Sequence, residues 1–154
     1  MAIKISKEKD EGHEVMALNY NYAGVQHYEL GQLDEALKHY DLAIKHDESQ
    51  GYFFYNRGLV KSKLDNINGA IIDYKKAIDL LQEPEYSYQA RFNRGICLRR
   101  LGSEHLEESI LDLKKAIDIK GDRASAYNNL GLSQFEKGDF DDALTMYTKA
   151  IQLE

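Results

Sequence analysis

The stretch Gly24–Ala43, GVQHYELGQLDEALKHYDLA, decides the fold of this chain, because its spacing of small residues returns at Gly131–Ala150, GLSQFEKGDFDDALTMYTKA. Each stretch has a glycine, a turn residue seven positions later, a further small residue, and an alanine seven positions beyond that. Two more stretches between them share the pattern. The four rows are Gly24, Gly31, Ala36 and Ala43; Gly58, Asp65, Ala70 and Ala77; Gly95, Gly102, Ser109 and Ala116; and Gly131, Gly138, Ala143 and Ala150. A fourfold internal repeat predicts a stacked scaffold whose units pack against one another.

The repeat has a basic period of 34 residues with two short insertions. The first glycines of the rows are 34, 37 and 36 residues apart, and the last alanines are 34, 39 and 34 residues apart. Three extra residues lie near Leu81–Ser87, and two lie in the turn Ser103–Glu108. Each period therefore has room for two helices and the turn that joins them.

The second half of each repeat carries apolar residues at the spacing of one helical face. Examples of this stripe are Leu37, Tyr40 and Ile44; Ile71, Tyr74 and Ile78; and Leu144, Tyr147 and Ile151. The small residues between the stripes let neighbouring helices approach closely. Gly31, Gly102 and Gly138 predict tight turns, and Asp139 is expected to cap the helix that follows it. The pattern predicts an all-α fold.

These residues resemble the tetratricopeptide repeat, a helix–turn–helix unit of 34 residues. The resemblance covers about Ala17–Glu154 and implies a right-handed α-solenoid of four units, or eight helices. In that family's register, the large residues early in the first helices are Tyr20, Phe54, Arg91 and Tyr127, and the aromatic position of the second helices holds Tyr40, Tyr74, Leu113 and Tyr147. The third repeat departs most from the pattern, because Arg91 and Leu113 stand where aromatic residues are expected.

The register divides the chain into an extension over residues 1–16 and repeats over 17–50, 51–87, 88–123 and 124–154. We expect Met1–Ser6 to be disordered and the first helix to extend back to about Lys7 at most, because Gly12 weakens a helix there.

The fourth repeat is expected to be uncapped. Tyr147, Ile151 and Leu153 are then partly uncovered, which repeat arrays normally avoid. We expect either that the chain is cut from a longer protein, which we favour, or that these residues mediate a homo-oligomer.

The composition excludes several classes of protein. The net charge of −6 argues against general nucleic-acid binding, and no apolar run approaches the roughly 20 residues needed to cross a bilayer. The only cysteine, Cys97, excludes an internal disulfide and suits a reducing compartment. We therefore expect a soluble, cytoplasmic protein without membrane insertion.

No residue pattern predicts an active site, a cofactor or a metal site. The glycines are dispersed at the repeat period rather than gathered in a phosphate-binding loop. None of the five histidines pairs with a cysteine or carboxylate at a metal-binding spacing. His39 and His46 lie seven residues apart and could share one face of a helix; we interpret them as surface or groove-edge residues. The sequence predicts a protein that is not an enzyme.

The resemblance implies that the first helices line a concave groove that binds extended peptides. One groove position holds Asn56, Asn93 and Asn129 in successive repeats, and a carboxamide can both donate to and accept from a peptide backbone. Leu59 and Ile96 are expected to form an apolar floor beside them. The candidate aromatic anchors are Tyr52, Tyr55 and Phe92. The alternatives are that the asparagines only solvate the groove and that the aromatic rings pack in the core.

Positive charge is concentrated on two adjacent first helices. The stretches Gly51–Leu64 and Tyr88–Gly102 contain no acidic residue, and their seven cations are Arg57, Lys61, Lys63, Arg91, Arg94, Arg99 and Arg100. We hypothesise that the groove prefers an acidic peptide or a terminal carboxylate, with Lys63 and Arg99 nearest to it. The alternative is that acids on the second helices, such as Asp73 and Asp112, balance these charges and that Arg57 and Arg94 are structural.

The family's readers of acidic chaperone tails use a lysine and an asparagine in one repeat, an asparagine in the next, and a lysine and an arginine in a third. Asn56 matches the middle element. Asn21 and Val25 depart from the first element, and Gln89 and Asn93 depart from the third. A chaperone-tail reader is therefore disfavoured.

The sequence predicts a non-catalytic protein–protein interaction module whose concave groove binds an extended segment. Two alternatives stay open. The chain could be a structural or self-associating subunit of a larger assembly, or a targeting segment of a larger multidomain protein.

Overall fold

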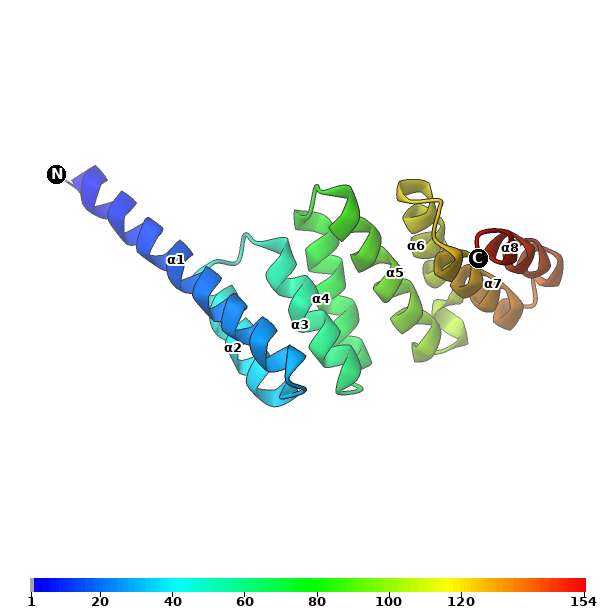
Figure 1. The fold of residues 1–154 in the computed structure, drawn as a ribbon, viewed down its shortest axis with the longest axis horizontal. Helices are drawn as coiled ribbons and strands as arrows, with labels where there is room; N and C mark the ends of the chain where they lie inside the picture. The colour runs from blue at the N-terminus through cyan, green and yellow to red at the C-terminus, as the bar shows by residue number, and fades with distance from the viewer. Residues whose placement is uncertain (1) are drawn as a thin grey trace.

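A computed structural model describes residues 2–154, with side chains described from residue 12 onward. The described chain is a succession of helices arranged along one axis (Figure 1). The elements are α1 (Ala2–Glu29), α2 (Leu33–His46), α3 (Gly51–Lys63), α4 (Ile67–Leu80), α5 (Pro84–Leu101), the 3₁₀ turn η1 (Ser103–His105), α6 (Leu106–Ile119), α7 (Ala124–Lys137) and α8 (Phe140–Gln152). The predicted all-α, right-handed solenoid of four helix pairs is confirmed.

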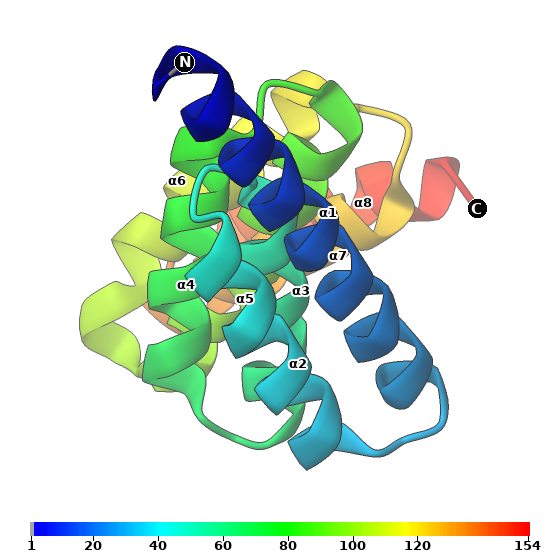
Figure 2. The same cartoon turned by 90° about the vertical axis from the view of Figure 1, so that its left-hand side faces the viewer.

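Each helix packs against the next one along the chain, so the stack has no gap between its units. The first helices of consecutive units also contact each other: α1 contacts α3, α3 contacts α5, and α5 contacts α7. These contacts place the first helices on the closely spaced, inner side of the stack. Figure 2 views the stack from its N-terminal end, with α1 in front and α8 behind.

The turns within the helix pairs follow the sequence prediction. Gly31, Gly102 and Gly138 have φ values of 75°, 143° and 96°, in the region that favours glycine. Asp65 fills the equivalent turn of the second repeat with φ 63°, which a short polar side chain tolerates. The prediction for Asp139 is wrong: it stands at the N-cap of α8, but its side chain makes no capping hydrogen bond and instead lies 2.9 Å from the Lys137 ammonium.

The repeated glycines lie where a side chain of the paired helix presses against the first helix. A Cβ atom at Gly58 would lie 2.9 Å from the ring of Tyr74, and one at Gly131 would lie 2.8 Å from Tyr147. In the third repeat, Leu113 takes the place of the ring, and a Cβ at Gly95 would lie 2.8 Å from it. The departure from the family's aromatic residue therefore leaves this contact in place.

The N-terminal extension differs from the expectation. Helix α1 begins at Ala2, so Ala2–Ser6, for which we expected disorder, are helical; Met1 lies outside the described residues. Gly12 is exposed inside this helix, with space around its Cα. A glycine there costs helix stability about 0.5–1 kcal/mol, which weakens a helix without ending it.

Candidate peptide-binding face

Polar contacts join consecutive first helices on the inner side of the stack. The Asn56 amide donates to the Asn21 carbonyl oxygen on α1 at 3.0 Å, and the Asn93 amide donates to the Tyr55 hydroxyl on α3 at 3.4 Å. Both asparagines are half-buried. Asn129 is different, because its amide donates to a backbone carbonyl of its own helix, that of Ser125, at 2.9 Å. Two of the three predicted asparagines therefore lie at junctions between repeats.

We call this inner surface the first-helix face. Its predicted polar members are Asn56, Asn93, Asn129, Lys63 and Arg99, and Leu59 and Ile96 are half-buried beside them.

The predicted aromatic anchors are largely taken up by packing. Tyr55 is only 8% exposed and belongs to the core around Tyr74, although its hydroxyl reaches Asn93. Burial raises the pKa of Tyr55 to about 12. Tyr52 is half-buried and packs edge-on against Phe53, and Phe92 stacks on Tyr88.

Buried carboxylates hold the cations of α3 and α5. Arg57 donates from Nε and Nη2 to Asp73 at 2.8 and 2.7 Å, and the Lys61 ammonium lies 2.8 Å from the same carboxylate. One repeat later, Arg94 donates to both oxygens of Asp112. Asp73 and Asp112 are each 1% exposed, so these pairs are part of the packing between helices.

The cations nearer the ends of the first helices have exposed partners. Arg99 donates to Glu136 at 2.7 Å, and Arg100 donates to Asp65 at 2.9 Å. Lys63 is exposed, and its ammonium lies 4.4 Å from the centre of the Tyr28 ring. The Nε of Arg99 is buried and has no hydrogen-bond partner in the described part of the chain. Lys63 therefore keeps capacity for an external polar group, whereas Arg99, whose free Nε is buried, can bind such a group only in competition with Glu136.

The second helix of each repeat carries the same stripe of apolar residues, and on α8 this stripe is exposed to solvent. Equivalent residues of the first three repeats are buried or half-buried: Leu33, Leu37, Tyr40 and Ile44; Ile67, Ile71, Tyr74 and Ile78; Leu106, Ile110, Leu113 and Ile117. On α8, Phe140, Leu144 and Ile151 are 61%, 66% and 71% exposed, while Tyr147 and Leu153 are half-buried. Phe140 packs edge-on against Phe135, at 5.3 Å between ring centres. We call the open surface the α8 face.

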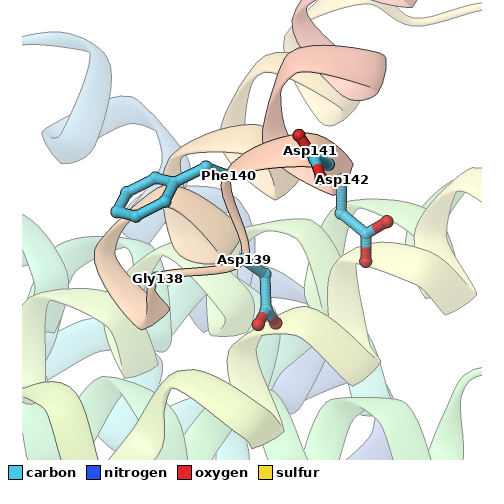
Figure 3. Close-up of a pocket in the computed structure, with 5 residues that line it drawn as sticks. All are labelled: Gly138, Asp139, Phe140, Asp141 and Asp142. Atoms are coloured by element: carbon cyan, nitrogen blue, oxygen red, sulfur yellow. The ribbon is translucent and has the colours of Figure 1, made fainter.

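A hollow at the turn between α7 and α8 is lined by the five residues Gly138–Asp142 (Figure 3). The Asp139 and Asp142 side chains extend away from the Phe140 ring in this view. Asp141 and Asp142 stand in the first turn of α8, where negative charge stabilises the positive end of the helix dipole. These acidic residues are explained by the start of the helix.

Cys97 is buried in the core and lies 3.5 Å from the Ser62 hydroxyl. Burial raises the pKa of its thiol, which disfavours the reactive thiolate.

No helix within residues 2–154 is long and apolar enough to cross a membrane.

Family models match three parts of the chain. A tetratricopeptide repeat model matches residues 52–80 and another matches 124–154, while a TPR repeat model matches 24–65. The chain is a tetratricopeptide repeat protein. The matched ranges leave out residues 81–123, which hold both insertions and the departures at Arg91 and Leu113.

Two curated relatives are longer proteins that match this chain over part of their length. FK506-binding protein 5 of Rhizopus delemar is 32% identical over 102 residues, covering 58% of this chain and 26% of that protein. The Protein STIP1 homolog of Dictyostelium discoideum is 24% identical over 160 residues, covering 84% of this chain and 28% of that protein. This tetratricopeptide repeat chain thus spans about a quarter of the length of either relative.

Solved structures share the fold at low identity. A crystal structure of MamA superposes with a TM-score of 0.82 at 23% identity, covering 89% of this chain and 77% of that one. The first TPR of Spaghetti (RPAP3), bound to the HSP90 peptide SRMEEVD, superposes with a TM-score of 0.71 at 22% identity, covering 86% of this chain and 95% of that one. Both support the tetratricopeptide repeat solenoid.

Proposed function

We propose that this tetratricopeptide repeat chain is a non-catalytic interaction module that binds an extended protein segment along the first-helix face. The observation that carries the proposal is the row of half-buried carboxamides at the junctions of α1, α3 and α5. Asn56 and Asn93 each bond to a polar group of the preceding first helix, which fixes their orientation. Each carboxamide has a second donor hydrogen and a carbonyl oxygen for a peptide backbone. The free, buried Cys97 is compatible with the reducing cytoplasm, where we place this function.

The preference for acidic segments rests on fewer groups than the sequence suggests. Arg57 and Arg94 are held by buried aspartates, so they contribute little to a ligand. Lys63 is exposed, and Arg99 has its Nη1 bonded to Glu136 and its Nε buried, so Arg99 binds a ligand only in competition with Glu136. The RPAP3 repeat domain, which has the same fold, was solved with a peptide that contains three acidic residues. We propose that Lys63 and Arg99 select acidic side chains or a terminal carboxylate by charge-assisted hydrogen bonds.

A peptide array probed with tag-free protein tests the proposal. The array pairs acidic and charge-neutral sequences, each with a free and an amidated C-terminus, so that side-chain and terminal carboxylates are separated. We expect the N56A/N93A double variant to bind the best peptide about tenfold more weakly, because two backbone contacts are lost. Its melting temperature should fall only modestly, because the variant also loses the bonds to Asn21 and Tyr55 that join consecutive repeats.

The N68A variant is the matched control, because Asn68 is an exposed asparagine on the second helix α4. If N56A/N93A binds as the parent does, the first-helix face is not the contact surface. A peptide that binds only through its terminal carboxylate would also contradict the proposed backbone contacts. Such binding is not expected, because Asn21, Val25, Gln89 and Asn93 depart from the chaperone-tail pattern.

One observation favours a second function. The α8 face exposes the same apolar positions that the other three repeats cover, so self-association through Tyr147, Ile151 and Leu153 with their neighbours Phe140 and Leu144 is the alternative proposal. Because the chain spans only about a quarter of the length of these relatives, we also propose a third role, as a targeting segment within a larger multidomain protein.

A further inference from the structure

Four of the five histidines gather between α1 and α2, in a row that the proposed function does not use. The row also contains Tyr20, and its ring order is His13, His46, Tyr20, His39 and His27. The distances between successive ring centres are 5.2, 5.4, 6.2 and 4.9 Å. The second and third repeats have Asp73 and Asp112 at the position of His39, so the histidine row belongs to the first repeat alone.

One contact in this row brings two metal-ligand atoms together. The Nδ1 atoms of His13 on α1 and His46 at the end of α2 lie 3.0 Å apart and share a hydrogen bond, so an ion bound by both nitrogens would replace the proton between them. Imidazole nitrogens bind first-row metal ions at about 2.0–2.1 Å. Two nitrogens 3.0 Å apart therefore subtend roughly a right angle at an ion that both contact. That angle suits adjacent positions of a square-planar or octahedral ion better than a tetrahedral site.

The surroundings of the pair favour access and orientation. His13 is exposed and His46 is half-buried, so an ion can reach both rings from solvent. Tyr20 stacks on the His46 ring at an interplanar angle of 20° and restricts its rotation. Because the two Nδ1 atoms share a hydrogen bond, binding of an ion requires the rings to turn until both lone pairs point toward it. Nitrogen ligands in this arrangement are typical for Cu²⁺ and Ni²⁺.

We propose that His13 and His46 form a two-imidazole site for a divalent transition-metal ion of the copper or nickel class. The ion links the middle of α1 to the C-terminal end of α2. Within the described residues no group of three or more histidine, cysteine or acidic side chains is placed to hold a metal, so solvent or external groups complete the coordination. Binding in the folded state only would stabilise the first repeat. This site lies apart from the first-helix face and does not depend on the proposed peptide binding.

The site is tested by titrating the tag-free full chain with Ni²⁺ and with Cu²⁺. Isothermal calorimetry measures the binding, and thermal melts with and without a chelator measure its effect on stability. We expect saturable binding of one ion per chain and a melting temperature that rises with ion concentration and returns on chelation. H13Q and H46Q should each lower the affinity by about tenfold or more and abolish the thermal shift, because each removes one ligand. H105Q, which changes a histidine in η1, should leave both readouts unchanged.

Cu²⁺ electron paramagnetic resonance separates ligation from a general effect on the fold. The parent should show coupling to two imidazole nitrogens, and H13Q to one. H13Q is the deciding variant, because His13 is an exposed helical residue whose replacement leaves the fold intact, as circular dichroism would verify. Unchanged affinity and unchanged nitrogen coupling in H13Q would overturn the proposal, as would loss of binding in H27Q with retention in H13Q.

Discussion

Arg57 on α3 donates two hydrogen bonds to the carboxylate of Asp73 on α4, and Arg94 repeats the arrangement with Asp112 in the next repeat. Each aspartate is 1% exposed, a depth at which an unpaired carboxylate would be strongly destabilising. The arginines are therefore structural partners that hold the two helices of a repeat together.

Replacing Asp73 with asparagine should lower the free energy of unfolding by about 2–4 kcal/mol. The change keeps the size of the side chain but leaves Arg57 and Lys61 without their shared counter-charge. Urea unfolding followed by circular dichroism measures the effect. D79N is the control, because Asp79 is an exposed acid on the same helix. If D73N and D79N have the same free energy of unfolding, the buried Arg57–Asp73 pair contributes nothing to stability.

The fold follows from the sequence because the deciding signal is local. Gly58 and Gly131 stand at the repeat spacing, and each lies against the tyrosine that the same spacing places on the paired helix. The pairing of side chains is not local. Arg99 meets Glu136 from 37 residues away, and His13 meets His46 from 33 residues away, so both contacts depend on how the helices pack and which rotamers result. From the sequence, Arg99 is therefore expected to face the ligand rather than to pair with Glu136, and no contact is predicted for His13.

A glycine-to-alanine pair tests the packing role of the repeat glycine. G58A should destabilise the protein by about 1–3 kcal/mol, because the new Cβ would lie 2.9 Å from the Tyr74 ring and force it to move. G12A should stabilise it by about 0.5–1 kcal/mol, because alanine favours an exposed helical site with open space. Thermal unfolding of both variants measures the difference. A stabilising G58A would show that Tyr74 adjusts without cost.

Glu136 should compete with acidic ligands for Arg99. Its carboxylate accepts a hydrogen bond from Arg99 at 2.7 Å, so E136Q frees the guanidinium and should raise the affinity for an acidic peptide several-fold. K63Q and R99Q should lower that affinity and flatten its dependence on salt. Fluorescence anisotropy at two salt concentrations measures all three, with E48Q, at an exposed acid in the turn after α2, as the control. If E136Q leaves the affinity unchanged, Arg99 does not contact the ligand.

Alkaline pH should destabilise the fold through its buried tyrosines. Burial raises the pKa of Tyr55 to about 12, above the usual value of 10.0. The contribution of the neutral phenol is fully present below pH 10 and is lost as the pH rises through 12, because the unfolded chain releases the proton first. The urea concentration at the midpoint of unfolding should change less between pH 9 and pH 11 in Y55F than in the parent. Y22F, at a tyrosine that is 67% exposed, should keep the parental difference.

Self-association through the α8 face predicts a mass that rises with protein concentration in sedimentation equilibrium. Leu144 and Ile151 occupy positions that are covered in the other three repeats, so a second copy that covers them removes apolar surface from water. L144E and I151E place a carboxylate on that surface and should each give a monomer at every concentration. I72E is the matched control, because Ile72 is 68% exposed on α4 and lies outside the repeated stripe. A parent that is monomeric at every concentration would contradict self-association, and an effect of I72E equal to that of I151E would point to charge rather than to this surface.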